Sequence, residues 1–253
     1  MFAVERQKKI LEALKADGSV LVSKLSSELG VTEETVRRDL EKLEKQEALV
    51  RTHGGAIPLD KSNHEMSLEK RKHLNVGIKE KLAKEAVKYI LPGDTVFLDA
   101  STTTFYMAKE LKSLKDITIV TNSIRIIAEL AGHTTLKVIG IGGYVSSNQS
   151  FVGKLATNYI EENCFANKVF FSSRGVTEKG EILDSNEQEW AVKQSMLKNS
   201  EKRFYLCDKS KIGRIGFAKL AGFSDIDYFI SEKDFDKNLQ KKLLDLEVNV
   251  ITV

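Results

Sequence analysis

Seven apolar runs separated by helical patterns restrict the fold of this chain more than any other feature. They are TVFLD (95–99), ITIVT (117–121), LKVIGIGG (136–143), KVFFSS (168–173), RFYLCD (203–208), DYFIS (227–231) and VNVITV (248–253). Amphipathic segments with helical spacing lie between and beside them, at residues 79–90, 103–114, 124–131, 155–162, 187–198 and 235–246. Strands that are apolar throughout and are connected through helices form a parallel sheet covered on both faces. The sequence therefore predicts an α/β domain with a mostly parallel sheet over residues 76–253.

Residues 1–57 have a different pattern, with amphipathic segments at 4–16, 21–29 and 32–46. The last two are separated by a turn that contains Gly30. A short helix, a glycine-containing turn and a second helix with arginines near its start are the pattern of a helix-turn-helix, whose second helix enters the DNA major groove. We therefore expect residues 1–57 to form a small DNA-binding domain.

The second helix of this motif has a recognisable start and two different faces. Thr32 is the expected N-cap, and the carboxylate of Glu34 in the first turn complements the helix dipole. Val36, Leu40 and Leu43 share one face at helical spacing, which we expect to be buried. The opposite face carries the candidates for DNA contact, Thr35, Arg37 and Arg38.

The segment that follows, ALVRTHGGAIP (48–58), has the composition of a β-wing. Two apolar residues precede Arg51 and His53, and a pair of glycines then supplies a turn. A wing lies along the phosphate backbone or a minor groove. Pro58 and the polar residues 59–63 are expected to begin a linker that runs to residue 75.

The charge balance does not by itself indicate a nucleic-acid binder. The chain has a formal net charge of +3, and residues 1–57 contain ten Lys/Arg and ten Asp/Glu. A basic surface must therefore come from the placement of charges and not from their excess. We expect one side to carry Arg37, Arg38, Arg51 and His53, with Glu12, Glu41, Glu44 and Glu47 elsewhere.

Several other classes of protein are not supported. Cys164 and Cys207 are isolated, and the four histidines, at positions 53, 64, 73 and 133, have no metal-ligand spacing. No apolar run reaches the roughly 18 residues of a membrane span, and the charged N-terminal segment is not a signal peptide. We therefore expect a cytoplasmic protein with no metal, no cofactor and no membrane partner.

Ligand-binding residues are expected in loops at the carboxyl ends of the parallel strands. The loop from Asp99 to Thr104 places four consecutive hydroxyl residues before a helix. Hydroxyls and free N–H groups at a helix start form an anion site, although such clusters also cap helices. Asn122, after the next strand, fits a ligand hydroxyl or a cap. Asp208 and Lys211 fit a sugar hydroxyl and a phosphate, or a solvated loop.

Several of these motifs together resemble one family. The segment ERQKKILEALKADGSVLVSKLSSELGVTEETVRRDLEKLEKQEALVRTHGGA (5–56) contains VRRDL followed by HGGA. The second part contains DASTT (99–103), TN (121–122), GG (142–143), FVG (151–153) and the pattern Asp208-x-x-Lys211-x-Gly213. On these motifs the chain resembles DeoR-type bacterial transcriptional regulators over essentially its whole length.

The resemblance implies a winged helix-turn-helix repressor joined to a sensor domain related in fold to ribose-5-phosphate isomerase. It implies a small phosphorylated sugar as effector and double-stranded operator DNA as partner. A homodimer or homotetramer is expected, because one helix-turn-helix reads too few base pairs. FVG, FFSS and DxxKxG look closest to repressors of phosphotransferase-system sugar operons.

The resemblance also assigns roles to individual residues. The DNA-binding candidates are Thr32, Glu34, Thr35, Arg37, Arg38, Arg51 and His53. Ser101, Thr102 and Thr103 match the phosphate-binding loop, although Ala100-Ser101 replaces a glycine that is common after the aspartate. Asp99, Asn122, Gly143, Asp208 and Lys211 match the sugar pocket, and Arg71 and Lys79 match basic positions of the connector helices.

The alternative is a sugar-phosphate isomerase-like enzyme with a DNA-binding appendage. An isomerase would carry an acidic loop where this chain has Ser172-Ser173-Arg174-Gly175. It would also need a general base, and the sequence assigns that role to none of the nearby acids, Asp184, Glu187 and Glu189. We therefore expect binding without turnover.

Overall fold

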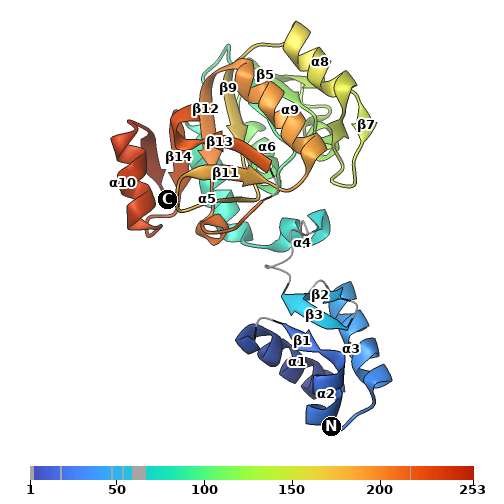
Figure 1. Ribbon diagram of the computed structural model, residues 1–253. Helices are drawn as coiled ribbons and strands as arrows, with labels where there is room; N and C mark the ends of the chain where they lie inside the picture. Colours follow the sequence, from blue (N-terminus) through green and yellow to red (C-terminus); the bar gives the residue numbers. More distant parts are fainter. Residues whose placement is uncertain (1–2, 18, 47, 53, 59–66, 217) are drawn as a thin grey trace. The chain divides into compact units, whose positions relative to one another are not determined.

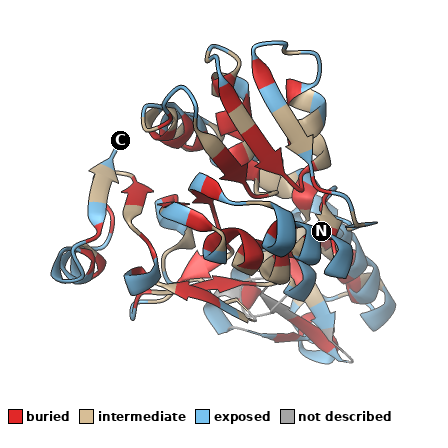
Figure 2. Cartoon of the chain, turned by 90° about the horizontal axis from the view of Figure 1, so that it is seen from above, coloured by how far each residue is buried: buried red, intermediate tan, exposed pale blue. Residues whose placement is uncertain are grey.

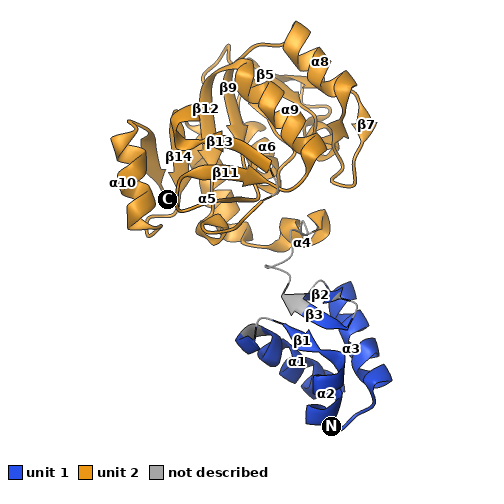
Figure 3. Ribbon diagram, in the orientation of Figure 1, with its two compact units in different colours: residues 1–66 blue, residues 67–253 orange. Residues whose placement is uncertain are grey.

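The computed structural model describes residues 3–17, 19–46, 48–52, 54–58, 67–216 and 218–253. The chain divides into two compact units, residues 1–66 and residues 67–253 (Figure 3). Glu47, His53 and the expected linker residues 59–63 lie outside the described residues.

The described part of the first unit is a winged helix-turn-helix, as the sequence predicts. Its helices are α1 (Ala3–Asp17), α2 (Val22–Leu29) and α3 (Glu33–Lys45) (Figure 1). Its strands β1 (Val20–Leu21), β2 (Leu49–Thr52) and β3 (Gly55–Pro58) form an antiparallel sheet in the order β1-β3-β2.

Two glycines explain how the chain makes the turns of this unit. Gly30 ends α2 in the left-handed region, at φ 63°, where a residue without a Cβ atom is not strained. A Cβ atom on Gly55 would lie 1.8 Å from the carbonyl oxygen of Val20, so only glycine allows β3 to pair this closely with β1. The buried face of α3, with Val36, Leu40 and Leu43, packs against the core of the unit.

The second unit is built on a seven-stranded sheet whose neighbouring strands all pair in parallel, in the order β15-β14-β12-β9-β4-β5-β6. The strands are β4 (Thr95–Leu98), β5 (Ile117–Thr121), β6 (Leu136–Gly140), β9 (Ala166–Phe171), β12 (Ser200–Leu206), β14 (Tyr228–Ser231) and β15 (Asn249–Thr252). The helices are α5 (Val76–Val87), α6 (Thr102–Leu111), α7 (Ile124–Leu130), α8 (Lys154–Asn163), α9 (Glu187–Lys198) and α10 (Lys237–Asp245). This sheet confirms the predicted α/β class.

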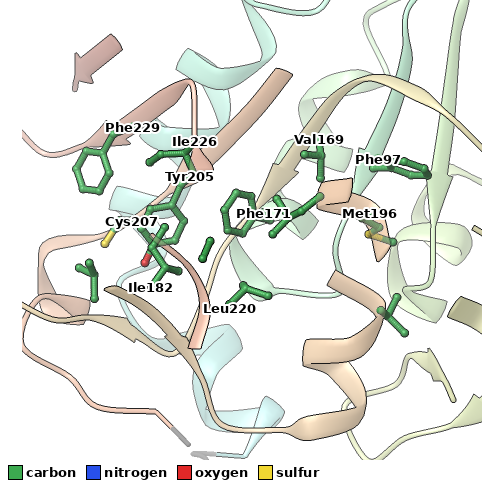
Figure 4. Close-up of a cluster of buried hydrophobic side chains, with 14 of the residues drawn as sticks. Phe97, Val169, Phe171, Ile182, Met196, Tyr205, Cys207, Leu220, Ile226 and Phe229 are labelled. Atoms are coloured by element: carbon green, nitrogen blue, oxygen red, sulfur yellow. The ribbon is translucent and has the colours of Figure 1, made fainter. Parts of the chain in front are cut away.

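The strands of the sheet send alternate side chains into two separate cores. Leu98 and Phe170 point to a core shared with α5, α6 and α7, whereas Phe97 and Phe171 point to a core shared with α8, α9 and α10. Figure 4 shows part of the second core, which continues through Tyr205. Figure 2 shows that buried residues follow the strands of the sheet and exposed ones the outer surfaces of the helices.

Several short elements were not predicted. Strands β10 (Gly175–Val176), β11 (Glu181–Asp184) and β13 (Ala218–Gly222) form a small antiparallel sheet, and β7 (Tyr144–Val145) pairs with β8 (Phe151–Val152). Strands β7, β8 and β10 have two residues each, which is too short for a periodic pattern, and among the described residues β11 and β13 form their sheet only with each other and with β10. Helix α4 (Leu68–His73), capped by Ser67, has six residues, and the 3₁₀ turns at Lys209–Lys211 and Phe223–Asp225 have three each.

The strand order determines where a ligand site is expected. From β4 the chain adds β5 and β6 on one side, and later adds β9, β12, β14 and β15 on the other. The order therefore reverses between β4 and β9, and ligands of open parallel sheets bind outside the carboxyl ends of the strands at such a point. Asp99 follows β4 and Ser172 follows β9.

Candidate functional site

The predicted DNA-contacting arginines lie on the exposed face of α3. The side chains of Arg37 and Arg38 are 54% and 74% exposed. In the free protein each pairs with a glutamate one turn earlier, Arg37 with Glu33 at 2.7 Å and Arg38 with Glu34 at 3.3 Å. Exposed pairs of this kind contribute only about 0.3–0.5 kcal/mol, so DNA phosphates can replace them at small cost.

The start of α3 is fixed by the predicted cap. The hydroxyl of Thr32 accepts a hydrogen bond from the backbone N–H of Thr35 at 3.3 Å. On the inner side, the buried carboxylate of Asp39 accepts hydrogen bonds from Gln7 Nε2 at 3.1 Å and from Arg6 Nε, both on α1. These contacts fix the rotation of α3 about its axis, and with it the direction of the exposed arginines.

The wing contains a contact that contradicts one sequence prediction. Glu44, at the end of α3, accepts a hydrogen bond from the backbone N–H of Arg51 at 3.0 Å. Its other carboxylate oxygen lies 3.9 Å from Arg51 Nε. The prediction that Glu44 lies apart from the basic side is therefore wrong, because the end of α3 packs beside β2. His53 lies outside the described residues.

In the second unit, the loop after β4 is organised by a fully buried carboxylate, Asp99. Its Oδ1 accepts hydrogen bonds from the backbone N–H of Ser101 at 3.1 Å and from Thr104 Oγ1 at 2.8 Å. The hydroxyl of Ser101 caps α6 by accepting the N–H of Thr104 at 3.2 Å. The loop therefore uses two of its hydroxyl residues to build the helix start.

The remaining two hydroxyl residues of the loop, Thr102 and Thr103, are the first residues of α6 and are both buried. By helix geometry their N–H groups have no intrahelical acceptor. Within the described chain no group hydrogen-bonds Thr103 Oγ1, although the side chain is only 1% exposed. A buried polar atom without a partner is costly, so this position is suited to an anion.

Basic side chains gather at the same edge of the sheet. Lys211 Nζ donates to Ser172 Oγ at 2.6 Å, and the buried Lys79 Nζ donates to the backbone carbonyl of Arg71 at 2.5 Å. Burial, together with the nearby charge of Lys211, lowers the pKa of Lys79 to about 8. Burial also lowers the pKa of Lys211, partly offset by Asp208. Repulsion between these lysines favours an anion beside them.

Asp208 links the basic cluster to the segment that precedes α5. Asn75 Nδ2 donates to Asp208 Oδ1 at 3.1 Å, and Ser210 Oγ donates to the same oxygen. Burial acts to raise the pKa of Asp208, but the charge of Lys211 and these hydrogen bonds outweigh it and leave the pKa lowered. Asp208 is therefore an ionised acceptor next to the lysines.

A further buried cation, Lys193, contacts the loop after β4 through Asp99. Lys193 of α9 is 7% exposed, and its ammonium lies 2.6 Å from Asp184, 3.2 Å from Asp99 and 2.9 Å from the carbonyl oxygen of Ser172. Burial acts to lower the pKa of Lys193, but the two aspartates outweigh it and raise the pKa above its usual value. Its three protons have three acceptors, so Lys193 holds the site together and is not available to a ligand.

Two protein-family models match the sequence of this chain. A profile described as DeoR-like helix-turn-helix domain matches residues 6–62, and one described as DeoR C terminal sensor domain matches residues 74–233. The chain belongs to the DeoR family of HTH-type transcriptional regulators.

Relatives in the DeoR family match the chain along nearly its whole length. The uncharacterized HTH-type transcriptional regulator YulB of Bacillus subtilis is 39% identical over 254 residues, covering 100% of this chain and 98% of the relative. The L-fucose operon activator of Haemophilus influenzae is 32% identical and covers 93% and 94% of the two chains. The lactose phosphotransferase system repressor of Lactococcus lactis is 35% identical and covers 83% of each.

Among solved structures, a ribose 5-phosphate isomerase from Methanocaldococcus jannaschii is 16% identical and covers 55% of this chain and 55% of its own, with a TM-score of 0.41. A ribose-5-phosphate isomerase in complex with phospho-erythronic acid gives a TM-score of 0.40 at 16% identity, over 58% and 55% of the two chains. Scores this low support no statement about the function of this DeoR-family chain.

The structure places most of the predicted DeoR effector residues at one edge of the sheet. Asn122 follows β5, next to Asp99, and its Nδ2 donates to the carbonyl of Phe151 at 3.0 Å. For Gly143, the structure gives a packing reason in addition to the predicted effector contact. A Cβ atom at this position would lie 2.7 Å from the carbonyl oxygen of Val152. Packing against β8 therefore already explains the glycine at position 143.

Sequence reasoning assigned no role to two buried residues of α9: it considered Glu189 only as a general base and set it aside, and it did not consider Lys193. They lie four residues apart on a helix whose buried face is otherwise largely apolar. Charged residues at positions where the helical period predicts burial were the signal that could have identified them. Among the described residues, no helix is long and apolar enough to cross a membrane, and no group of three His, Cys, Asp or Glu side chains could hold a metal.

Proposed function

We propose that this DeoR-family chain is a cytoplasmic repressor of a sugar-utilisation operon, of the phosphotransferase-system type, and that a phosphorylated sugar releases it from its operator. The observation that carries the proposal is the start of α6 at the switch point, where Thr103 Oγ1 has no partner within the described chain, on the edge of the sheet that also carries Lys79 and Lys211. Such a site combines unpaired helix N–H groups with two cations, which is the chemistry that phosphate requires.

The effector site has a phosphate end and a sugar end in this proposal. The N–H groups of Thr102 and Thr103, with the hydroxyls of the loop from Ser101, bind the phosphate, and the two lysines neutralise it. Asp208 and Asn122 accept hydrogen bonds from sugar hydroxyls. Burial and the charge of Lys211 hold the pKa of Lys79 low, and the negative charge of the phosphate offsets both, so Lys79 is charged in the complex.

The connector is the proposed route from effector to DNA. We assign residues 1–57 to DNA binding, 58–75 to the connector and 76–253 to sensing. Two connector residues already contact the site: Asn75 donates to Asp208, and Arg71 Nη2 donates to Asn148 Oδ1 at 2.6 Å. An effector that rearranges these contacts shifts the population of DNA-competent molecules, but only by its difference in affinity for the two states.

The DNA end rests on α3 and the wing. Arg37 and Arg38, with Thr35 beside them and Thr32 and Glu34 at the helix start, lie on the face proposed to enter the major groove. Arg51, in the wing, contacts the phosphate backbone of the DNA. An arginine that reads a base edge contributes about 1–3 kcal/mol of discrimination, whereas a phosphate contact adds affinity that falls with salt. We propose a homodimer or homotetramer, because paired half-sites give the required length of operator.

The sign of regulation is proposed as repression. The named relatives include a lactose phosphotransferase system repressor and an L-fucose operon activator. Reporter expression from the target promoter, measured with and without the gene for this chain, distinguishes the two. Expression that falls when the gene is deleted would identify an activator.

We propose that the chain binds sugar phosphates without converting them. Ser172-Ser173-Arg174-Gly175 stands where an isomerase of this fold would have an acidic loop. The specific observation that favours the enzyme alternative is Glu189, a buried carboxyl whose pKa is raised by burial. A coupled assay with pentose and hexose phosphates decides between them, and turnover that Glu189→Gln abolishes would establish the enzyme.

The experiment that tests the proposed function directly is a thermal-shift panel of sugar phosphates on the full chain. Ligand that binds the folded state raises the unfolding midpoint by mass action. We expect a rise with one or more sugar phosphates and a smaller one with the corresponding free sugars. No rise with any phosphorylated compound would count against an effector site of this kind.

A further inference from the structure

Glu189 occupies an unusual position next to the proposed effector site. It lies in the first turn of α9, where the cap residue Asn186 accepts its backbone N–H at 3.1 Å. The side chain is 5% exposed. Its Oε1 accepts hydrogen bonds from Ser146 Oγ at 3.0 Å and from Ser150 Oγ, both in the loop between β7 and β8.

The hydrogen bonds of Glu189 leave half of the carboxylate unused. Both serines donate to Oε1, and no described residue donates to Oε2. Lys193, one turn later, does not contact Glu189, because its ammonium is occupied by Asp184, Asp99 and the Ser172 carbonyl. Among the described residues, Oε2 therefore remains available to accept a hydrogen bond from a ligand.

A buried acceptor without a partner among the described residues lies directly after β5. Asn122 is 1% exposed, and its Oδ1 has no hydrogen-bond partner within the described chain, although its Nδ2 is occupied by Phe151. The same loop connects the two acceptors, because Ser150, which donates to Glu189, pairs with Ser123 immediately after Asn122. Asn122 and Glu189 therefore belong to one region, defined by the loop between β7 and β8 that contacts both of their elements.

The region joins the proposed phosphate site through a short series of contacts. Asp99 Oδ1 organises the start of α6, and Asp99 Oδ2 lies 3.2 Å from Lys193 of the helix that carries Glu189. Arg71, in the connector, donates to Asn148 of the loop that holds Glu189. The two lysines and the helix N–H groups therefore lie at one end of the proposed site, and the acceptors Glu189 and Asn122 at the other, where Arg71 is bonded to Asn148.

We propose that Glu189, together with Asn122, reads the uncharged end of the effector: it accepts hydrogen bonds from terminal hydroxyl groups and excludes phosphorylated sugar acids. The inference rests on the proposed effector site and specifies the class of ligand. The effector is a phosphate monoester of a polyol or neutral sugar. A ligand carboxylate at that end would face the carboxylate of Glu189, whose like charge opposes binding.

The test compares two ligands that differ at one carbon. Glucitol 6-phosphate ends in a hydroxymethyl group where gluconate 6-phosphate ends in a carboxylate. Binding of each to the full chain is measured by titration calorimetry, with inorganic phosphate as the probe of the phosphate end. We expect the wild type to bind the polyol ester at least about tenfold more tightly than the acid, and Glu189→Gln to reduce this ratio to about threefold or less.

A matched control and the opposing outcomes make the test decisive. Glu187→Gln removes the same charge from the same helical turn at an exposed position and is expected to leave the ratio unchanged. Glu189→Asp keeps the charge and is expected to keep the discrimination. The proposal is overturned if the wild type binds the acid as tightly as the polyol ester. It is also overturned if Glu189→Gln leaves the ratio of the two affinities unchanged. A chain that binds inorganic phosphate but neither of the two organic ligands also overturns the proposal. A chain that binds none of the three ligands refutes the proposed effector site itself.

Discussion

The ammonium of Lys193 lies 3.2 Å from the carboxylate of Asp99, in a buried contact that ties α9 to the loop after β4. Asp184 shares the same ammonium at 2.6 Å. Lys193 in the middle of α9 therefore connects the small antiparallel sheet, through Asp184 of β11, with the loop that begins α6, through Asp99. The geometry of the proposed effector site therefore depends on an ion cluster that contacts no ligand.

Replacing Lys193 tests this dependence. Lys193→Met leaves Asp99 and Asp184 buried without their cation, and breaking a buried pair in this way costs about 3–5 kcal/mol. We expect the free energy of unfolding in urea to fall by this amount. Lys202→Met, which removes the exposed partner of Asp227, is the matched control and should have a much smaller effect. Equal losses in the two variants would contradict a structural role of the cluster.

The lowered pKa of Lys79 predicts a pH-dependent affinity. In the free protein Lys79 loses its proton near pH 8, and an anion bound beside it favours the protonated form. Binding therefore takes up a proton above pH 8, and affinity for a phosphate ester should fall by up to about tenfold per pH unit there. The phosphate is fully ionised in this range, since its second pKa is about 6.

Titration calorimetry from about pH 7 to about pH 9.5 measures this dependence, and Lys79→Arg, whose charge does not titrate there, should remove it. The same shift acts on folding with the opposite sign. The unfolded chain, with the lysine pKa at 10.5, binds more protons than the folded chain between pH 8 and 10.5. The contribution of Lys79 to stability therefore rises with pH in this window. An affinity that is independent of pH in the wild type would exclude Lys79 from the phosphate end.

Substitutions of the threonines at the start of α6 test effector binding without disturbing the fold. Thr102→Val with Thr103→Val should leave operator binding and stability nearly unchanged, because Thr103 Oγ1 makes no hydrogen bond within the described chain. Release of DNA by the effector should weaken by about tenfold or more, as expected when a charge-assisted hydrogen bond is lost. Thr104→Val is the contrasting variant. Its hydroxyl donates to Asp99, so it should lose about 1–3 kcal/mol of stability. A normal inducer response in the double variant would remove Thr102 and Thr103 from the phosphate site.

Arg38 tests the recognition helix. Arg38→Ala removes a side chain that is 74% exposed and paired only with Glu34 of the same helix among the contacts described. We expect little change in stability or effector affinity, and a loss of about 1–3 kcal/mol of operator discrimination in a gel-shift assay. Lys45→Ala, in the last turn of α3 and equally exposed, is the control. Retained sequence preference in the Arg38 variant would contradict the assignment of this face.

The sequence was sufficient for the features that depend on periodicity and on chain order. Val36 and Leu40 lie on the buried face of α3 because the 3.6-residue period places them there. The strand ending at Thr121 and the helix beginning at Glu187 have the predicted bounds. Asp99 and Asn122 each follow the carboxyl end of a strand. Because the strands are parallel, all their carboxyl ends lie at the same edge of the sheet, and the two residues therefore lie there too.

The features that the sequence did not supply are contacts between side chains far apart in the chain. Lys193 and Asp99 are separated by more than ninety residues, and no local pattern relates them. Glu44 and Arg51 are close in sequence, but the turn after α3 brings their charges together where composition predicted separation. The short strands β10 and β11 depend on mutual pairing and not on their own composition.

The central claim is that a phosphorylated sugar bound beside Lys211 weakens operator binding by the full chain. It is tested by measuring the operator Kd without ligand and with a saturating sugar phosphate selected by the thermal-shift panel, in the wild type and in Lys211→Met. We predict that the ligand raises the operator Kd at least about tenfold in the wild type, and that the variant binds the operator normally but no longer responds. An operator Kd that is the same with and without ligand in the wild type would contradict the account.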